Sequence, residues 1–272
     1  MSPTILAMGG GGFTAAPGDP ALDELVLDLT GLDEPRILFL PTAGGDAAGQ
    51  IGAFHGAFGD RLCRPQVLSL FRLQGWRRTV REIVLDQDVI YVGGGSMRNM
   101  LAIWRAHGLD AILREAWERG IVLAGLSAGA MCWFQGGVSK SGGCPEAIEG
   151  LGFLPGSLSV HADGEPERLP VYLEAVLAGT LPGGWALDDG VGLVIEGDAL
   201  VRVVSARPGA SALRVDAVAG ELVRSRVEPD LLGTEGERAV PSDVREFRAL
   251  SRHGATNPSA RRTSRGARPP RS

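Results

Sequence analysis

A serine stands among small residues in the segment GLSAG at 125–129. The segment follows an apolar run at 120–125 and precedes residues 130–134, which we expect to open a helix. A serine in a sharp strand-to-helix turn needs small neighbours, because strand and helix approach each other closely there. Such a turn directs the Ser127 hydroxyl outward at the carboxyl end of a sheet, where open α/β folds bind ligands. The pattern predicts a nucleophile, and the alternative is a packing turn without chemistry.

A serine nucleophile needs a base, and the chain has four histidines. His253 lies in the tail, His55 in an amphipathic segment and His107 at a helix end, where structural or surface roles are expected. His161 follows a short apolar run, 34 residues after Ser127. We therefore expect it at a strand end on the same side of the sheet, and predict His161 as the base.

An oxyanion hole needs backbone N–H groups directed at the developing negative charge. One is expected from Ala128, the residue after the nucleophile. A second is available from the triple glycine at 93–95, because residues without side chains let a substrate carbonyl approach the backbone. The triple glycine matches neither a dinucleotide-binding fingerprint nor a phosphate-binding loop. A second glycine run at 9–12 fails the same tests, and we interpret it as a tight turn beside the site.

These residues need a scaffold, and the apolar pattern predicts one. Short continuous apolar runs alternate with amphipathic stretches over the first 130 residues, which is typical of strands buried on both faces of a parallel sheet. Strand–helix–strand units of this kind place helices on both faces. The expected strands are 4–8, 36–40, within 62–70, 88–92 and 120–125, and the expected helices are 21–30, 45–58, 99–106 and 110–119.

After residue 183 the pattern changes to short runs separated by Gly, Asp or Pro, which predicts an antiparallel meander appended to the sheet. Its strands are expected at 185–187, 191–196, 199–205, 212–218 and 221–227. We interpret 1–240 as a single α/β domain. The Ser-, Arg- and Pro-rich tail at 241–272 is expected to be disordered.

Composition excludes several classes of protein. The chain has 272 residues, 40 of them glycine without a collagen period, and a net charge of −5, which argues against nucleic-acid binding. Three scattered cysteines predict neither a disulfide framework nor a Cys-based metal site. Neither a signal peptide nor a membrane-spanning run is visible. We expect a cytoplasmic monomer or homodimer without nucleic-acid or membrane partners.

Four segments, FLPTAGG, VGGGSMRNML, GLSAGAMCWF and HADGEPERLP, carry a family resemblance in this order. Together they resemble the S51 serine peptidases, which include dipeptidase E, an enzyme that cleaves dipeptides with N-terminal aspartate, and the related cyanophycinases. The resemblance implies a three-layer α/β/α fold with a mainly parallel sheet, of the class I glutamine amidotransferase-like (flavodoxin-like) type. It also implies Ser127 as nucleophile, His161 as base and Gly94 with Ala128 at the oxyanion hole, acting on a short peptide without metal or organic cofactor.

The third member of the triad departs from this family's pattern. In these peptidases an Asp or Glu stands roughly 15 to 20 residues after the serine, where this chain has Ser139-Lys140-Ser141. A lysine cannot accept a hydrogen bond from a histidine N–H. The nearest carboxylates are Glu146 and Glu149, and we predict that Glu146 orients His161, with a solvated loop glutamate as the alternative.

Selectivity for an N-terminal aspartate requires a cation that pairs with its carboxylate. Arg168 is the candidate, in a segment that resembles the family's with an offset of about one residue, and Arg98 is the alternative. We further expect Asn99 to order the glycine loop and Glu165 to contact the substrate amine.

Three functions follow from these observations. The first is a serine peptidase that forms an acyl-enzyme on Ser127, of the dipeptidase E or cyanophycinase-like kind. The second is an α/β-hydrolase esterase, which the order of the site residues disfavours, because the only histidine beyond His161 lies in the tail. The third is a weakly active or non-catalytic binding protein on the same scaffold, motivated by Lys140.

Overall fold

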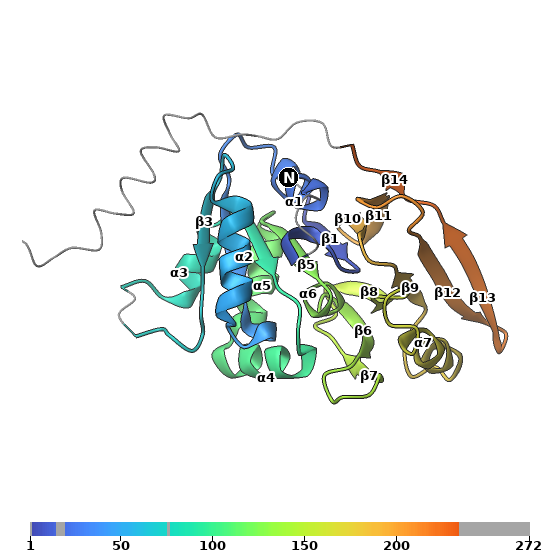
Figure 1. Ribbon diagram of the computed structural model, residues 1–272. Coiled ribbons are helices and arrows are strands. Elements are labelled where there is room, and N and C mark those ends of the chain that lie inside the picture. Colours follow the sequence, from blue (N-terminus) through green and yellow to red (C-terminus); the bar gives the residue numbers. More distant parts are fainter. Residues whose placement is uncertain (1, 15–19, 75–76, 234–272) are drawn as a thin grey trace, which may run out of the picture. The chain divides into compact units, whose positions relative to one another are not determined.

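The computed structural model describes residues 2–14, 20–74 and 77–233 (Figure 1). The tail at 241–272 and the disorder predicted for it lie outside these ranges. No helix within them is both long and apolar enough to cross a membrane.

Eight strands form one sheet in the order β14-β11-β10-β1-β5-β4-β2-β3. The strands from β1 to β3 in this order are parallel, whereas β10 pairs antiparallel with β1 and with β11. The predicted parallel α/β sheet is thereby confirmed. The bounds are β1 Thr4–Met8, β2 Arg36–Leu40, β3 Arg64–Val67, β4 Val89–Val92, β5 Val122–Leu126, β10 Val191–Glu196, β11 Ala199–Ser205 and β14 Asp230–Leu231.

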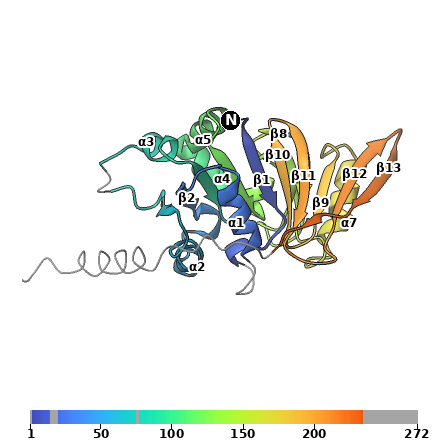
Figure 2. The same cartoon turned by 90° about the horizontal axis from the view of Figure 1, so that it is seen from above.

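Helices cover both faces of this sheet, as Figure 2 shows for α1 and α2 on one side and α3 and α5 on the other. The central strands β1, β4 and β5 are nearly continuous apolar runs because alternate residues enter different cores. In β1, for example, Leu6 packs with residues of α1 and α2, whereas Ile5 packs with residues of α3, α4 and α5. The helices are α1 Ala21–Asp28, α2 Ala48–Phe58, α3 Val80–Leu85, α4 Met97–His107 and α5 Leu109–Glu118.

A second sheet has six strands in the order β13-β12-β9-β8-β6-β7. Helix α7 packs against it through a core that includes Tyr172 and Val176. The bounds are β6 Phe134–Ser139, β7 Glu146–Glu149, β8 Leu154–Ser159, α7 Arg168–Leu177, β9 Gly184–Leu187, β12 Ala212–Val218 and β13 Glu221–Val227.

The expected C-terminal meander is corrected in its arrangement. Its strands lie where the sequence predicts them, but β10 and β11 extend the large sheet, whereas β9, β12 and β13 belong to the second one. The helix expected from 130–134 is also shorter: α6 spans only Ala128–Met131, and Phe134 already begins β6. The chain leaves the helix there because Phe134 pairs with Leu154 of β8, a contact between distant residues.

Candidate active site

Ser127 lies in the turn between β5 and α6, with φ 54° and ψ −116°. A non-glycine residue in this conformation is strained and is held there by its surroundings. Its N–H donates to the carbonyl of Met8 at 3.0 Å, which ties the turn to the end of β1. A Cβ on Gly125 would overlap the carbonyl of Gly129, and one on Gly129 would overlap that of Val92. The small residues around the serine are therefore a steric requirement, as the sequence predicts.

His161 approaches Ser127 from the other sheet, just beyond the end of β8. Its Nε2 lies 2.9 Å from the Ser127 Oγ, which is hydrogen-bond distance. The backbone of His161 also has a positive φ, 56°. Two strained residues thus meet at one point, and this geometry suits the nucleophile and base that the sequence predicts for this pair.

The carboxylate that orients His161 is Asp189, not the predicted Glu146. Asp189 Oδ1 lies 2.5 Å from His161 Nδ1, so both ring nitrogens have partners. Glu146 instead starts the outer strand β7 and pairs with Arg98, with 2.6 Å between Oε1 and Nη2. Glu146 pairs with Ser139 at the end of β6, and this register places it at the edge of the second sheet beside Arg98.

Asp189 belongs to an Asp-Asp-Gly turn between β9 and β10, 28 residues after His161. The other aspartate, Asp188, accepts hydrogen bonds from the backbone N–H and the hydroxyl of Ser211, which leaves Asp189 for the histidine. In the sequence this segment signals only a turn between strands. A carboxylate just after a predicted strand is the signal that could have identified Asp189. The same criterion, a polar side chain at a strand end, identifies Ser127 and His161.

Lys140 lies away from the imidazole. Its Nζ is 2.6 Å from Glu167 Oε1 and 3.2 Å from Glu165 Oε2. The hydrogen bond with Glu167, and to a smaller extent that with Glu165, raises the pKa of Lys140. The lysine therefore joins the loop after β6 to the loop after β8 and leaves the triad geometry intact.

The candidate oxyanion donors lie against the serine. A Cβ on Gly94 would come within 3.3 Å of the Ser127 Cβ, so the glycine loop touches the nucleophile. Among the described residues, neither the amide of Gly94 nor that of Ala128 donates to another backbone group. Gln50 Nε2 donates to the Gly94 carbonyl at 3.3 Å and so contacts the next peptide group of the glycine loop, Gly94–Gly95. Two backbone N–H groups are thus available next to Ser127.

The other glycine run also borders the triad. A Cβ on Gly10 would overlap Asp189 Oδ1 and come within 2.9 Å of the His161 Cε1. A glycine is needed at position 10 because a larger side chain on this residue after β1 would clash with His161 and Asp189. This position agrees with the predicted turn beside the site.

Asn99 lies in the first turn of α4, directly after the glycine loop. Its backbone N–H donates to the Ser96 Oγ at 3.2 Å, so that the Ser96 side chain caps the helix. The Ser96 N–H in turn donates to the carbonyl of Ala43 at 2.8 Å. The start of α4 and the glycine loop are thereby fixed together, with Asn99 contributing through its main chain.

Arg168 is buried, with 6% of its surface exposed. Its Nε donates to Glu165 Oε2 at 2.7 Å and its Nη1 to the carbonyl of Val138 at 3.0 Å. Burial acts to raise the pKa of Glu165, but the hydrogen bond from Arg168, its charge and the hydrogen bond from Lys140 outweigh burial and lower that pKa. The cation predicted to bind a substrate carboxylate is therefore already paired within the protein.

Within the described ranges, no group of three or more His, Cys, Asp or Glu side chains is arranged to hold a metal ion.

Among solved structures, the fold is similar to that of a peptidase from an acI-B1 Actinobacterium, with a TM-score of 0.65 and 21% identity. That match covers 84% of this chain and 95% of the other. A putative peptidase E protein from Listeria monocytogenes EGD-e matches with a TM-score of 0.47 and 15% identity, over 84% of this chain and all of the other.

Sequence similarity is stronger. The chain is 47% identical over 211 residues to an uncharacterized peptidase, YgaJ, of Bacillus subtilis (strain 168), which covers 78% of this chain and 91% of that protein. The model of peptidase family S51 matches residues 5–203, a range that contains Ser127, His161 and Asp189. The chain belongs to peptidase family S51.

Proposed function

We propose that this peptidase is a serine peptidase of the dipeptidase E type, which hydrolyses short peptides through an acyl-enzyme on Ser127. The observation that carries the proposal is the continuous set of hydrogen bonds from Ser127 Oγ to His161 Nε2 and from His161 Nδ1 to Asp189. This arrangement has the three roles of a hydrolytic triad: a nucleophile, a base and a group that orients the base.

The chemistry proceeds in two halves. The Ser127 Oγ attacks the peptide carbonyl while His161 Nε2 accepts its proton, and the Gly94 and Ala128 amides donate to the oxyanion. The C–N bond then breaks as His161 returns the proton to the leaving amine, which leaves an ester on Ser127. Water, deprotonated by His161, attacks the ester; the ester C–O bond breaks as His161 returns the proton to Ser127 Oγ, which releases the acid and restores the free serine. Asp189 stabilises the imidazolium that forms in each half.

Preference for an N-terminal aspartate is the finer part of this proposal. Lys140 and Arg168 are the cations nearest to Glu165, and both bind it. A substrate aspartate would compete with Glu165 for these cations, whereas a substrate ammonium group would add to its partners. Comparing Asp-Xaa with Leu-Xaa dipeptides of the same second residue tests this preference directly.

The alternative of a non-catalytic binding protein was suggested by Lys140. That lysine pairs with Glu165 and Glu167, and the partner of His161 Nδ1 is Asp189. The decisive experiment measures hydrolysis of a dipeptide panel, including Asp-Xaa members, by the purified protein and by Ser127→Ala. We expect turnover only for the unchanged protein, and a fluorophosphonate adduct on Ser127 by mass spectrometry. Activity that survives Ser127→Ala, or a protein that neither turns over a peptide nor reacts with the probe, would contradict the proposal.

A further inference from the structure

The orienting carboxylate lies on an exposed turn. Asp189 has 41% of its side chain exposed and sits between two strands that belong to different sheets. Its neighbour Gly190 donates its N–H to the carbonyl of Gly10 at 3.1 Å, which fixes one side of the turn. A carboxylate on such a turn keeps a productive direction only if other groups hold its backbone in place.

Asp163 holds that backbone. Its Oδ1 accepts the N–H of Asp189 at 2.9 Å. Because Asp163 follows His161 by two residues, one short loop carries both the base and the acceptor that anchors the acid. The position of Asp189 is thus set relative to the imidazole itself, and a shift of the loop would move both together.

Arg207 completes the arrangement from the end of β11. Its Nη2 binds the second oxygen of Asp163, Oδ2. Its own backbone is fixed by Ser205, whose Oγ accepts the Arg207 N–H at 3.0 Å and donates to the Arg207 carbonyl at 2.8 Å. The guanidinium therefore reaches Asp163 from a rigid strand end.

The charges agree with this geometry. Burial acts to raise the pKa of Asp163, but hydrogen bonds from Arg207 and from the Asp189 N–H outweigh it and lower that pKa. Asp163 thus stays an anion, which accepts two hydrogen bonds at once. The same contact, with the nearby negative charges, raises the pKa of Arg207, so the guanidinium that binds Asp163 stays a cation.

We propose that Asp163 and Arg207 are positioning residues of the triad: Arg207 holds Asp163, and Asp163 holds the Asp189 backbone in line with His161 Nδ1. The inference rests on the proposed function, since it assigns these residues to the same hydrolytic site. Neither side chain contacts Ser127 or His161, so their influence passes through Asp189.

The test compares Asp163→Ala, Asp163→Asn, Arg207→Ala and Arg207→Lys, with Arg202→Ala as the matched control. Arg202 lies on β11, five residues before Arg207, is as exposed as Arg207 (48% against 47%) and also pairs with an aspartate, Asp230. Each kcat is expressed per active site titrated with a fluorophosphonate probe, so that a smaller folded fraction does not lower it.

We expect kcat to fall by roughly 100-fold in Asp163→Ala and roughly 10-fold in Arg207→Ala, because small misplacements of catalytic groups have effects of this size. KM should stay unchanged, since neither residue is assigned to substrate binding. Asp163→Asn keeps the acceptor oxygen and Arg207→Lys keeps the charge, so both should recover part of the loss. Arg202→Ala should behave as the unchanged protein.

Two results would overturn the inference. The first is a kcat per titrated active site that is the same in Arg207→Ala and Arg202→Ala. The second is a change in the Asp163 and Arg207 variants that affects KM alone. Should Asp163→Ala fail to fold, the two Arg207 variants and Asp163→Asn still decide. Failure of the proposed function is distinguishable, because it appears as activity that persists in Ser127→Ala or as no activity in the unchanged protein.

Discussion

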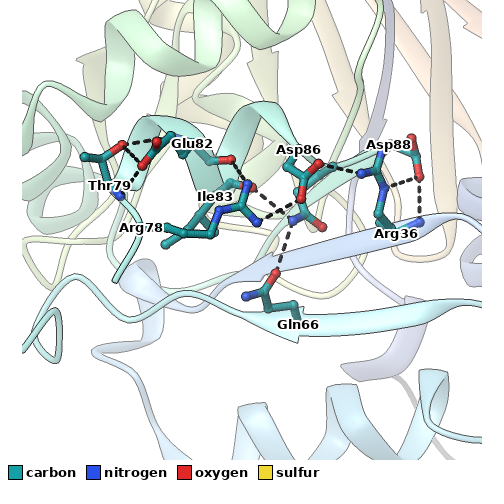
Figure 3. A network of polar contacts seen from close by, with 9 residues as sticks. Arg36, Gln66, Arg78, Thr79, Glu82, Ile83, Asp86 and Asp88 are labelled. Carbon is teal, nitrogen blue, oxygen red and sulfur yellow. Dashed lines mark hydrogen bonds and ion pairs between the residues drawn. The ribbon is translucent and has the colours of Figure 1, made fainter. Parts of the chain in front are cut away.

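The amino and carboxyl ends of the parallel strands in the large sheet differ in how fully their polar groups are hydrogen-bonded. At the amino edge, Arg36 begins β2 and binds Asp88, which precedes β4, through its backbone N–H, Nε and Nη2 at 2.8–3.0 Å. Asp86 bridges Arg36 and Arg78, as Figure 3 shows. In the same figure, Thr79 and Glu82 cap the start of α3 reciprocally. The charged groups of this network, Arg36, Arg78, Glu82, Asp86 and Asp88, all have partners.

At the carboxyl edge the same sheet leaves groups unmatched. Ser127 has a strained backbone, and among the described residues the amides of Gly94 and Ala128 donate to no backbone group. Strain and unsatisfied donors are unfavourable for folding and persist where the surroundings impose them. Contacts at the amino edge therefore stabilise the sheet, whereas the carboxyl edge keeps strained and unpaired backbone groups beside Ser127. Changes at the two edges should therefore separate activity from stability.

The largest effect is expected at the carboxyl edge, from Asp189→Asn. The amide cannot orient the neutral imidazole correctly, so kcat should fall by roughly 10³- to 10⁴-fold while the melting temperature changes little. The matched control is Glu146→Gln, the carboxylate that pairs with Arg98, and it should retain kcat within about twofold. Steady-state kinetics on the best dipeptide check both. Equal losses in the two variants would remove Asp189 from its assigned role.

Gly129→Ala should reduce both stability and activity. A Cβ there would overlap the backbone of Val92. To remove this clash, β4 and the Ser127 turn must move apart, which costs about 2–3 kcal/mol. Gly49→Ala is the control, because a Cβ at that position in α2 meets nothing within 4 Å and should stabilise by about 0.5–1 kcal/mol. Chemical denaturation measures both free energies of unfolding. A Gly129→Ala variant as stable as the unchanged protein would show that the Ser127 turn accommodates a Cβ at this position.

Asp88→Asn should act on stability alone. It weakens the bonds to Arg36 and should lower the free energy of unfolding by about 1–2 kcal/mol at neutral pH, with kcat unchanged. Burial acts to raise the pKa of Asp88, but the bonds from Arg36 outweigh it and lower that pKa below 3.8.

The sign of the pH dependence follows. A carboxylate with a lowered pKa in the folded state stabilises above its unfolded value and loses that contribution as pH falls through the folded value. The stability difference between Asp88→Asn and the unchanged protein should therefore shrink below about pH 4. Thermal unfolding at pH 7 and pH 3 checks this, and a difference that grows toward acid would contradict it.

Lys140→Met should have the smallest effect. The lysine binds two exposed glutamates and does not touch the triad, so kcat should change by less than about threefold. A change in KM for Asp-Xaa but not for Leu-Xaa peptides would place Lys140 at the substrate. A loss of kcat comparable to that of Asp189→Asn would mean that Lys140 takes part in the chemistry.

Local patterns predict most of the scaffold. Strands such as Thr4–Met8 and Arg36–Leu40 appear at the predicted residues, because burial on both faces makes them continuous apolar runs. The serine turn is equally local, since the small residues that allow it are adjacent in sequence. Helix α3 escaped prediction although Thr79 and Glu82 form its capping box, because six residues give little periodicity.

What the sequence does not predict depends on pairing between distant segments. Phe134 is a strand residue because of β8, and the C-terminal strands divide between two sheets because β10 inserts beside β1. The same cause explains Glu146: its distance from Ser127 along the chain is suitable, but pairing of β7 with β6 places it beside Arg98. Asp189 reaches His161 only once both sheets are formed.

The insertion of β10 beside β1 has a consequence for synthesis. Ser127 and His161 leave the ribosome before Asp189, and the turn that bears Asp189 is fixed only when β10 joins the first strand of the chain. A chain stopped short of β10 carries the serine and the histidine without the carboxylate that orients the imidazole. The complete set of contacts at Ser127 and His161 therefore requires strand β10 in place beside β1, the first strand of the chain.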